Sequence, residues 1–326
     1  MSAPVVTLTL NPAIDQTVTL DSLTPGAVHR AAAVRHDAGG KGVNVASCLA
    51  DWGVRVAATG LLGADNAAPF TALFAAKGIA DHFVRVAGET RTNIKLVDRR
   101  AGETTDINLP GLRPGPAALA TVEEGLNGLV ANGTLVVLAG SLPDGLDPGA
   151  YAHFIPVLAG RGARVVLDTS GVPLARALAG DLPFCVKPNR HELEVWAGRR
   201  LEDRADLLGV ARRLNAAGVG LVAVSLGAAG ALFVTAGEAL HAGAREVTGG
   251  SSVGAGDAMV AGLVAGLHEG LPLDALARRA TAFAVAKLGR PGPHLPDRAT
   301  VESLAAAVAV TPAEGWAAAA STAAPI

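Results

Sequence analysis

One segment of the sequence combines glycines, a carboxylate and a predicted helix start. It reads Gly-Gly-Ser-Ser-Val-Gly-Ala-Gly-Asp over residues 249–257 and runs into an apolar helical stretch over residues 258–267. Backbone N–H groups at a helix start lack intrahelical partners and carry partial positive charge, so a glycine-lined start can hold a phosphate. Asp257 lies in the first predicted turn, where its carboxylate can take a proton from a hydroxyl that attacks phosphorus. The segment therefore predicts phosphoryl transfer, with an ordinary acidic residue at a helix N-terminus as the alternative.

A second glycine cluster, Ala-Gly-Gly-Lys-Gly-Val-Asn over residues 38–44, precedes another predicted helix. Close approach of a glycine backbone and the charge of Lys41 suit a phosphorylated ligand, and a tight turn with a solvated lysine is the alternative. Asp15 ends the segment Asn-Pro-Ala-Ile-Asp, which follows the first predicted strand. Polar groups beyond the carboxyl end of a parallel strand point into the ligand crevice of such sheets. Asp15 is thus a candidate to hold sugar hydroxyls, or else a turn residue.

Three better-known ligand motifs are incomplete in this sequence. The glycines around residue 254 fail the dinucleotide pattern G-x-G-x-x-G because Met259 stands where its third glycine belongs. The P-loop pattern fails because Gly42, not serine or threonine, follows Lys41. The zinc-protease pattern H-E-x-x-H begins at His191 but has Val195 in place of its second histidine. These three classes of site are therefore not indicated.

Short apolar runs alternate with helix-length segments along most of the chain. The runs at residues 5–10, 54–59, 134–139, 164–168, 184–186 and 220–225 are predicted as buried parallel strands. The segments at residues 44–52, 67–77, 117–130, 150–158 and 201–217 are predicted as helices. This alternation is typical of a doubly wound α/β sheet, which binds ligands beyond the carboxyl ends of its strands.

Two stretches interrupt the alternation. Residues 16–34 read as extended pieces around a Pro-Gly turn, and residues 83–109 read as successive strands without helices between them. We expect both to pair into one small sheet that acts as a lid, or alternatively as a packing or dimer sheet. Residues 1–310 are predicted as the main domain, and residues 311–326, rich in alanine, as a loosely held tail.

Composition restricts the partners of the chain. The net charge is -2 and no long run of Lys or Arg occurs, which disfavours nucleic acid as a partner. No apolar stretch reaches the roughly 18 to 20 residues that span a bilayer, so we expect no membrane insertion. Cys48 and Cys185 lie far apart in apolar runs, which suits core cysteines in a reducing compartment. We expect a cytoplasmic location.

Four motifs occur together in an order that resembles the ribokinase-like, PfkB-type carbohydrate kinases. They are TLNPAID at residues 9–15, GGKGVNVA at residues 39–46, KPNRHELE at residues 187–194 and SVGAGD at residues 252–257. The resemblance covers the chain to about Thr311. It implies a three-layer α/β/α sandwich with a mostly parallel, doubly wound sheet and a small β-sheet lid.

The resemblance also implies a role for each matching residue. Asp257 matches the catalytic base, and the amides of Gly254, Ala255 and Gly256 match an anion hole for the transferring phosphoryl group. The positions that match the ATP site are Lys187, Asn189, Ser225, Gly227, Ser252 and Lys287. Asn189 and Glu192 match an N-x-x-E element that organises Mg²⁺ through water or ATP phosphates. The positions that match the sugar-phosphate site are Asp15, Gly40 and Asn44 for the sugar, and Lys41, Arg91 and Ser141 for its phosphate.

The lysine of the second glycine cluster favours a sugar phosphate over a free sugar within this family, because its charge calls for an anion. Residues 91–96 and 187–201 resemble bacterial family members that act on fructose 1-phosphate, which implies fructose 1-phosphate, ATP and Mg²⁺ as ligands. Tagatose 6-phosphate and fructose 6-phosphate are the alternatives. Ala27 and Val28 stand where kinases of fructose 6-phosphate carry a phosphate-binding lysine, which disfavours that sugar.

The family resemblance further implies a homodimer formed through the lid. Two readings from other classes stay open at this stage. A kinase-like fold that only senses a sugar phosphate is disfavoured because Asp257 and its glycines are retained. A dinucleotide-dependent oxidoreductase is disfavoured because its glycine fingerprint is missing.

Overall fold

The computed structural model describes residues 5–243, 253–290 and 292–319. Its large sheet has ten strands: β1 (Val5–Thr9), β4 (Val56–Gly63), β5 (Ala80–Val86), β8 (Leu135–Ala139), β9 (Arg164–Asp168), β10 (Cys185–Val186), β11 (Leu221–Ser225), β12 (Ala231–Val234), β13 (Ala239–Gly243) and β14 (Ala309–Pro312). They lie in the order β14-β13-β12-β11-β10-β9-β8-β1-β4-β5. From β11 to β5 all neighbours are parallel, whereas β11 to β14 pair antiparallel.

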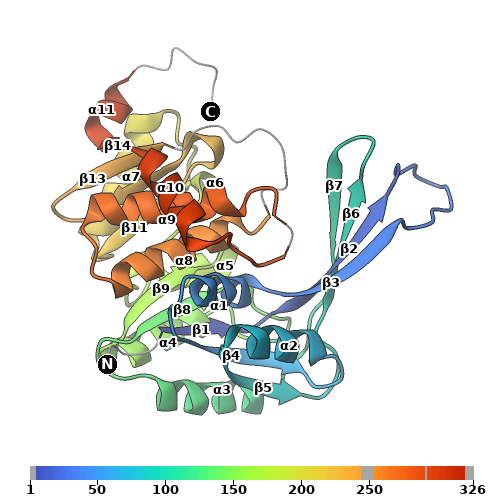
Figure 1. The fold of residues 1–326 in the computed structure, drawn as a ribbon. Helices are drawn as coiled ribbons and strands as arrows, with labels where there is room; N and C mark the ends of the chain where they lie inside the picture. The colour runs from blue at the N-terminus through green and yellow to red at the C-terminus, as the bar shows by residue number, and fades with distance from the viewer. Residues whose placement is uncertain (1–4, 244–252, 291, 320–326) are drawn as a thin grey trace.

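Helices cover both faces of this sheet (Figure 1). One face is covered by α1 (Lys41–Asp51), α2 (Ala68–Lys77), α8 (Ala255–His268), α9 (Leu273–Lys287) and α10 (Arg298–Ala307). The other is covered by α3 (Pro116–Leu129), α4 (Ala150–Gly160), α5 (Gly171–Ala177), α6 (Arg190–Ala197), α7 (Arg204–Ala216) and α11 (Ala313–Ala318). Each face has its own apolar core, since successive strand residues such as Val5 and Val6 point to opposite sides. The predicted three-layer α/β/α sandwich is confirmed.

Alanine and glycine let the core helices approach closely despite the scarcity of aromatic residues. Helix α8 is buried along most of its length and lies against α9. A Cβ atom added to Gly262 of α8 would lie 2.7 Å from the Cα atom of Ala280 of α9. No side chain larger than hydrogen fits there without a shift, so Gly262 fixes the position of α8 and of the residues at its start.

A second, four-stranded sheet projects away from this body (Figure 1). It consists of β2 (Ala13–Leu20), β3 (Ala33–Gly39), β6 (Thr92–Asp98) and β7 (Glu103–Asn108), in the order β3-β2-β6-β7. The hairpin β2–β3 and the hairpin β6–β7 join through a parallel pairing of β2 with β6. The predicted pairing of two sequence-distant segments into a small sheet is confirmed.

The boundaries of the small sheet differ from the prediction. Residues 83–86, expected in the lid, belong to β5 at the edge of the large sheet, where Phe83 pairs with Gly60 of β4. The Phe83 ring stacks on Phe74 of α2 at 5.7 Å between centroids, so burial against the core helix holds this strand in the main body. The first of the two segments, predicted at residues 16–34, is longer than expected. It begins at Ala13 and ends at Gly39.

The expectation of a loosely held tail is wrong for residues 311–318. Strand β14 pairs with β13 over residues 309–312, and α11 follows it directly. Ala313 is fully buried and Trp316 is 9% exposed. Edge pairing and these two apolar anchors hold the segment against the body, which alanine content alone did not indicate. Within the described residues, no helix is long and apolar enough to cross a membrane.

Candidate active site

Asp257 lies at the third position of α8, in the first turn of a helix that begins with glycine at Gly254. Gly254 adopts a φ of 80°, a conformation open to glycine and strained for other residues. Asp257 is only 7% exposed, and burial raises the pKa of its carboxyl group to about 6, against the opposing field of Lys41. Asn44 donates a hydrogen bond from Nδ2 to Oδ2 of Asp257 at 2.7 Å. A carboxylate with a pKa near neutrality, held in one orientation, is suited to proton transfer.

The glycine cluster before α1 lets this helix start directly against the end of β1. Gly40 precedes α1 with a φ of 107°, and a Cβ atom there would lie 2.8 Å from the Cα atom of Pro12. A Cβ atom on Gly42 would lie 2.3 Å from Oγ1 of Thr9. These contacts leave no room for side chains, so the two glycines place Lys41 and Asn44 on the first turn of α1.

A buried carboxylate joins two lysines beside this helix start. Both carboxylate oxygens of Asp168 lie 3.2 Å from Nζ of Lys41, and Oδ1 lies 3.3 Å from Nζ of Lys187. The Asp168 side chain is fully buried; burial alone would raise its pKa, but the two lysines outweigh burial and lower it. For Lys41, burial acts first to lower the pKa, and Asp168 with Asp257 and Glu192 raises it above its ordinary value. Lys41 and Asp168 are therefore both charged at neutral pH.

Asp168 was not predicted as a site residue, although the strand that it ends was. The available signal was a carboxylate at the carboxyl end of a buried parallel strand, which is where ligand crevices form. Its position also corrects one sequence argument. The charge of Lys41 does not by itself require an anionic substrate, because Asp168 gives Lys41 a counter-ion within the protein.

Arg91 and Ser141 lie at the neighbouring strand ends. The guanidinium of Arg91 donates to the carbonyls of Asn11 and Pro12, which follow β1, at 3.2 and 3.3 Å. Asn11 donates from Nδ2 to Oγ of Ser141 at 3.1 Å and so joins the ends of β1 and β8. Ser141 is exposed, and its neighbour Gly140 packs near the Cβ atom of Lys41. Asn11 is a second residue of the site that was not predicted.

The predicted N-x-x-E element forms the first turn of α6. The side chain of Asn189 accepts from the backbone N–H of Glu192, and the side chain of Glu192 accepts from the backbone N–H of Asn189, both at 2.8 Å. This capping box was not recognised in the sequence, where serine or threonine usually takes the first place. Asn189 bridges to Ser225 at the end of β11, beside the turn η1 (Gly227–Ala229). Lys187, Asn189, Ser225 and Gly227 thus lie at or just beyond the carboxyl ends of two adjacent strands, β10 and β11.

The donor atoms fit a loosely held Mg²⁺ better than a cage. The described residues contain no cluster of three or more His, Cys, Asp or Glu side chains placed to hold a metal ion. Mg²⁺ often binds through one or two carboxylates, water and substrate phosphates. A carboxylate can accept about four hydrogen bonds, so the capping box leaves Glu192 capacity for a hydrated cation.

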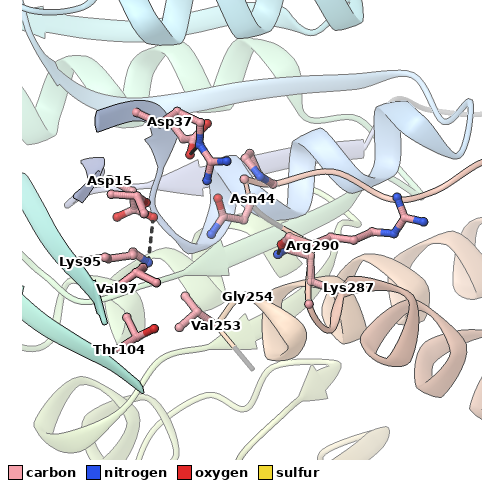
Figure 2. A pocket seen from close by; sticks show the side chains of 15 residues that line it. Asp15, Asp37, Asn44, Lys95, Val97, Thr104, Val253, Gly254, Lys287 and Arg290 are labelled. Atoms are coloured by element: carbon pink, nitrogen blue, oxygen red, sulfur yellow. Dashed lines mark hydrogen bonds and ion pairs between the residues drawn. The ribbon is translucent and has the colours of Figure 1, made fainter. Parts of the chain in front are cut away.

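A cavity of about 270 Å³ lies between the small sheet and the starts of α1 and α8 (Figure 2). Asp15 enters it from β2 and forms an ion pair with Lys95 of β6 at 3.2 Å. Asn44 and Gly254 line it as well, as do Lys287 at the end of α9 and Arg290 just beyond it (Figure 2). After Asp168 and Asn11, Lys95 is a third residue of the site that was not predicted.

The remaining predicted residues fall around the same helix start. Lys287 is buried, donates to the carbonyl of Arg290, and packs against Gly254. A Cβ atom on Gly256 would lie 3.8 Å from Nζ of Lys187, so this ammonium group faces the helix start. Ser252, expected in the nucleotide site, lies outside the described residues.

The arrangement therefore has two sides that meet at the start of α8. One side holds Asp15, Gly40, Lys41, Asn44, Arg91 and Ser141; the other holds Lys187, Asn189, Glu192, Ser225 and Gly227. Lys287 lies at the boundary, where it lines the cavity with Asp15 and Asn44. Between them lie the amides of the first turn and the carboxylate of Asp257. This geometry can bring an acceptor hydroxyl and a phosphate donor together over a positive helix end.

Comparison with known proteins agrees with this chemistry. The model of the pfkB family carbohydrate kinases matches residues 8–299. A 1-phosphofructokinase of Xanthomonas campestris pv. campestris is 56% identical over 292 residues, which cover 88% of this chain and 92% of the relative. A 1-phosphofructokinase of Rhodobacter capsulatus is 50% identical over 311 residues, with 95% and 98% covered.

Among solved structures, phosphofructokinase-2 from Escherichia coli in complex with fructose-6-phosphate superposes with a TM-score of 0.87 at 28% identity. The superposition covers 94% of this chain and 99% of that one. The fold, the buried carboxylate at a glycine-lined helix start and the match over most of the sequence lead to one conclusion. The chain belongs to the pfkB family of carbohydrate kinases.

Proposed function

We propose that this chain transfers the γ-phosphoryl group of ATP to the C6 hydroxyl of fructose 1-phosphate, giving fructose 1,6-bisphosphate and ADP. The observation that carries the proposal is Asp257, a carboxylate with a pKa near 6 at a glycine-lined helix start. The similarity to two 1-phosphofructokinases at 56% and 50% identity supports the choice of sugar.

In this mechanism the sugar phosphate occupies the side of the site formed by α1 and the ends of β1 and β8. Lys41, Arg91 and Ser141 bind its phosphate: Asn11 contacts both Arg91 and Ser141, and Gly140, the neighbour of Ser141, lies near Lys41. Asp15, Asn44 and the backbone at Gly40 hold its hydroxyl groups. The ion pair with Lys95 at 3.2 Å holds the Asp15 carboxylate in place within the cavity.

Asp257 acts as general base on the acceptor. As the C6 oxygen forms its bond to the γ-phosphorus, the O–H proton passes to Asp257 and the bond from the γ-phosphorus to the ADP oxygen breaks. Asn44 fixes one oxygen of Asp257 at 2.7 Å and leaves the other for the hydroxyl. The amides of Gly254, Ala255 and Gly256 stabilise the charge on the transferring group, with Lys187 alongside.

The nucleotide is held on the other side by Lys187, Asn189, Ser225, Gly227, Ser252 and Lys287. Asn189 and Glu192 would hold Mg²⁺ through water or the phosphates of ATP, and the cation would supply neutralisation of phosphate charge. The turn η1 exposes backbone groups, which suits contact with the phosphates and the flat base of a nucleotide.

We also propose a homodimer formed through the small sheet. The face that lines the cavity carries Thr17, Lys95 and Thr104. The opposite face pairs Val18 with Val34 and Ile94 with Ile107, and Val34 and Ile107 remain 50% and 42% exposed. Clustered exposed apolar residues on a sheet favour association with a second copy. Light scattering should give twice the chain mass, and a Val34→Asp, Ile107→Asp variant should give the chain mass.

A panel of acceptors tests the substrate. ADP release should give the highest kcat/KM with fructose 1-phosphate and a poor value with free fructose, which offers nothing to Lys41 and Arg91. Tagatose 6-phosphate and fructose 6-phosphate are the competing acceptors. If either is used at least tenfold more efficiently under the same conditions, the proposed substrate is wrong, while the kinase family assignment stands.

A further inference from the structure

The segment from β14 to α11, residues 309–318, lies beyond the part of the chain that matches the family model, which ends at residue 299. We call it the terminal segment. It covers β13 at the edge of the large sheet and lies near α7. His241 of β13 in turn contacts the carbonyl of Ala229 in the turn η1, the candidate nucleotide turn that follows β11. The terminal segment therefore lies one strand away from the site without being part of it.

Trp316 anchors the terminal segment between two side chains. Its indole ring stacks on the imidazole of His241 of β13, with 4.6 Å between centroids and 12° between planes. The guanidinium of Arg204 lies 5.1 Å from the Trp316 ring centroid and donates to the Trp316 carbonyl at 3.4 Å. Stacked and cationic partners give a flat ring one defined orientation. Trp316 thus fixes the plane of the His241 ring.

His241 carries this constraint to the candidate nucleotide turn. Nε2 of His241 lies 2.7 Å from the carbonyl oxygen of Ala229, the last residue of η1. A carbonyl can only accept, so Nε2 donates. The backbone of the next residue, Gly230, lies close to the backbone of β13: a Cβ atom on Gly230 would be 2.0 Å from the carbonyl oxygen of Ala242. The turn is therefore held against β13 by one side-chain bond and one close backbone approach.

We infer that His241, held by Trp316, is a positioning residue for nucleotide binding, because it fixes the turn Gly227–Ala229 from outside the site. The inference rests on the proposed nucleotide site. Burial lowers the pKa of His241, so its ring is neutral at physiological pH, which suits close stacking on an indole. A purely structural role for the terminal segment, as a cover for the sheet edge, predicts a loss of stability without a selective loss of nucleotide affinity.

The test is the dissociation constant of MgATP, measured by calorimetry in the absence of any sugar phosphate. His241→Ala should weaken MgATP binding roughly 2- to 10-fold, the value of one neutral hydrogen bond. KM for MgATP should rise by the same factor, while KM for the sugar phosphate and kcat change less than twofold. His241→Gln should restore most of the affinity, because its amide N–H can reach a carbonyl as donor.

Two further variants separate positioning from stability. Trp316→Leu keeps an apolar anchor but removes the stacking, and it should weaken MgATP binding in the same direction as His241→Ala without adding to it. Glu314→Gln breaks the ion pair with Arg212 in the same segment but touches neither ring, so MgATP affinity should be unchanged. Unchanged MgATP affinity in both His241→Ala and Trp316→Leu would overturn the inference, as would an equal rise in KM for both substrates. Because this binding assay contains no sugar, a different preferred sugar would refute the proposed substrate and leave this result intact.

Discussion

The two sides of the candidate site are built differently. On the proposed sugar-phosphate side, polar groups are already paired within the protein: Asp168 binds Lys41, as well as Lys187 of the other side, and Asn44 binds Asp257. On the proposed nucleotide side, Lys187 and Lys287 are buried, but Asn189 and Gly227 sit at exposed ends of secondary structure, in the capping box of α6 and the turn η1. One side is therefore ordered before any ligand arrives, whereas the other offers backbone groups that a ligand can complete.

This difference predicts different consequences of mutation. Removing one member of a buried charged group leaves its partner unpaired, which is costly and alters the chemistry. Removing a capping or turn contact exposes only groups that water already reaches, so the loss is modest. Substitutions on the sugar-phosphate side should therefore have larger effects than those on the nucleotide side.

The largest effect is expected from Asp257→Asn, which keeps the shape of the residue but removes the base. A positioned general base contributes about 10² to 10⁴ in rate, so the single-turnover rate should fall by that order. The dissociation constants of MgATP and of the sugar phosphate should change only a few-fold. A rate within about threefold of the parent, at an unchanged thermal midpoint, would remove Asp257 from the mechanism.

The next effect concerns stability, through Asp168→Asn. This variant leaves Lys187 buried without its carboxylate, and Lys41 is affected less because its side chain is 36% exposed. The free energy of unfolding at pH 7 should fall by about 3 kcal/mol, measured by urea denaturation. A loss below about 0.5 kcal/mol would show that the lysines are solvated and that the ion pairs of Asp168 with Lys41 and Lys187 do not form in solution.

The same variant has a pH signature. Because the lysines lower the pKa of Asp168 in the folded protein, its stabilising effect is complete above the unfolded-state pKa near 4 and is lost as pH falls through the folded-state pKa. The stability difference between parent and Asp168→Asn should therefore be constant from about pH 7 to 5 and narrow below about pH 4.

Lys41→Ala should weaken sugar-phosphate binding about 10- to 150-fold, the value of a charge-assisted contact of roughly 1.5 to 3 kcal/mol. MgATP affinity should barely change. Lys77→Ala is a matched control, because Lys77 is also a shielded lysine in an ion pair, with Asp51 at 2.7 Å, but lies outside the site. If both variants bind the sugar phosphate as the parent does, Lys41 serves only as the partner of Asp168.

The smallest effect is expected on the nucleotide side, from Glu192→Gln. Glutamine preserves the capping box but removes the negative charge, so the stability of α6 should be kept. The Mg²⁺ concentration that gives half the maximal rate should rise about fivefold, which corresponds to a solvated charge interaction of about 1 kcal/mol. An effect as large as that of Lys41→Ala would contradict the proposed contrast between the two sides.

The sequence predicted those parts of the site that depend on local order. A glycine-lined helix start followed by Asp257 reads directly from adjacent residues, as does the run around Lys41. Asp168 could not be assigned in this way, because its role depends on lysines supplied by α1 and by the segment after β10. Asn11 and Lys95 were missed for the same reason: their partners, Ser141 and Asp15, come from distant segments.

The fold shows the same limit. The alternation of strands and helices was sufficient to predict the α/β/α sandwich. It did not predict which of the two sheets each edge strand would join. Residues 83–86 join the large sheet because Phe83 finds a partner in Phe74, and residues 309–312 join it because β13 has an open edge. Both outcomes depend on tertiary contacts that local composition does not encode.

The most direct test of the account is the pH dependence of kcat/KM for fructose 1-phosphate in the parent and in Asp257→Asn. With a pKa raised by burial to about 6, Asp257 is ionised above pH 6 and protonated below it, so the parent rate should fall about tenfold per unit as pH drops below 6. Substrate phosphates also titrate near pH 6, but they do so equally in both proteins, and the ratio of the two rates removes their effect. The account predicts that the ratio of kcat/KM in the parent to kcat/KM in Asp257→Asn is constant above about pH 7 and declines below pH 6. A ratio that stays constant from pH 5 to 8 would contradict the assignment of Asp257 as the catalytic base.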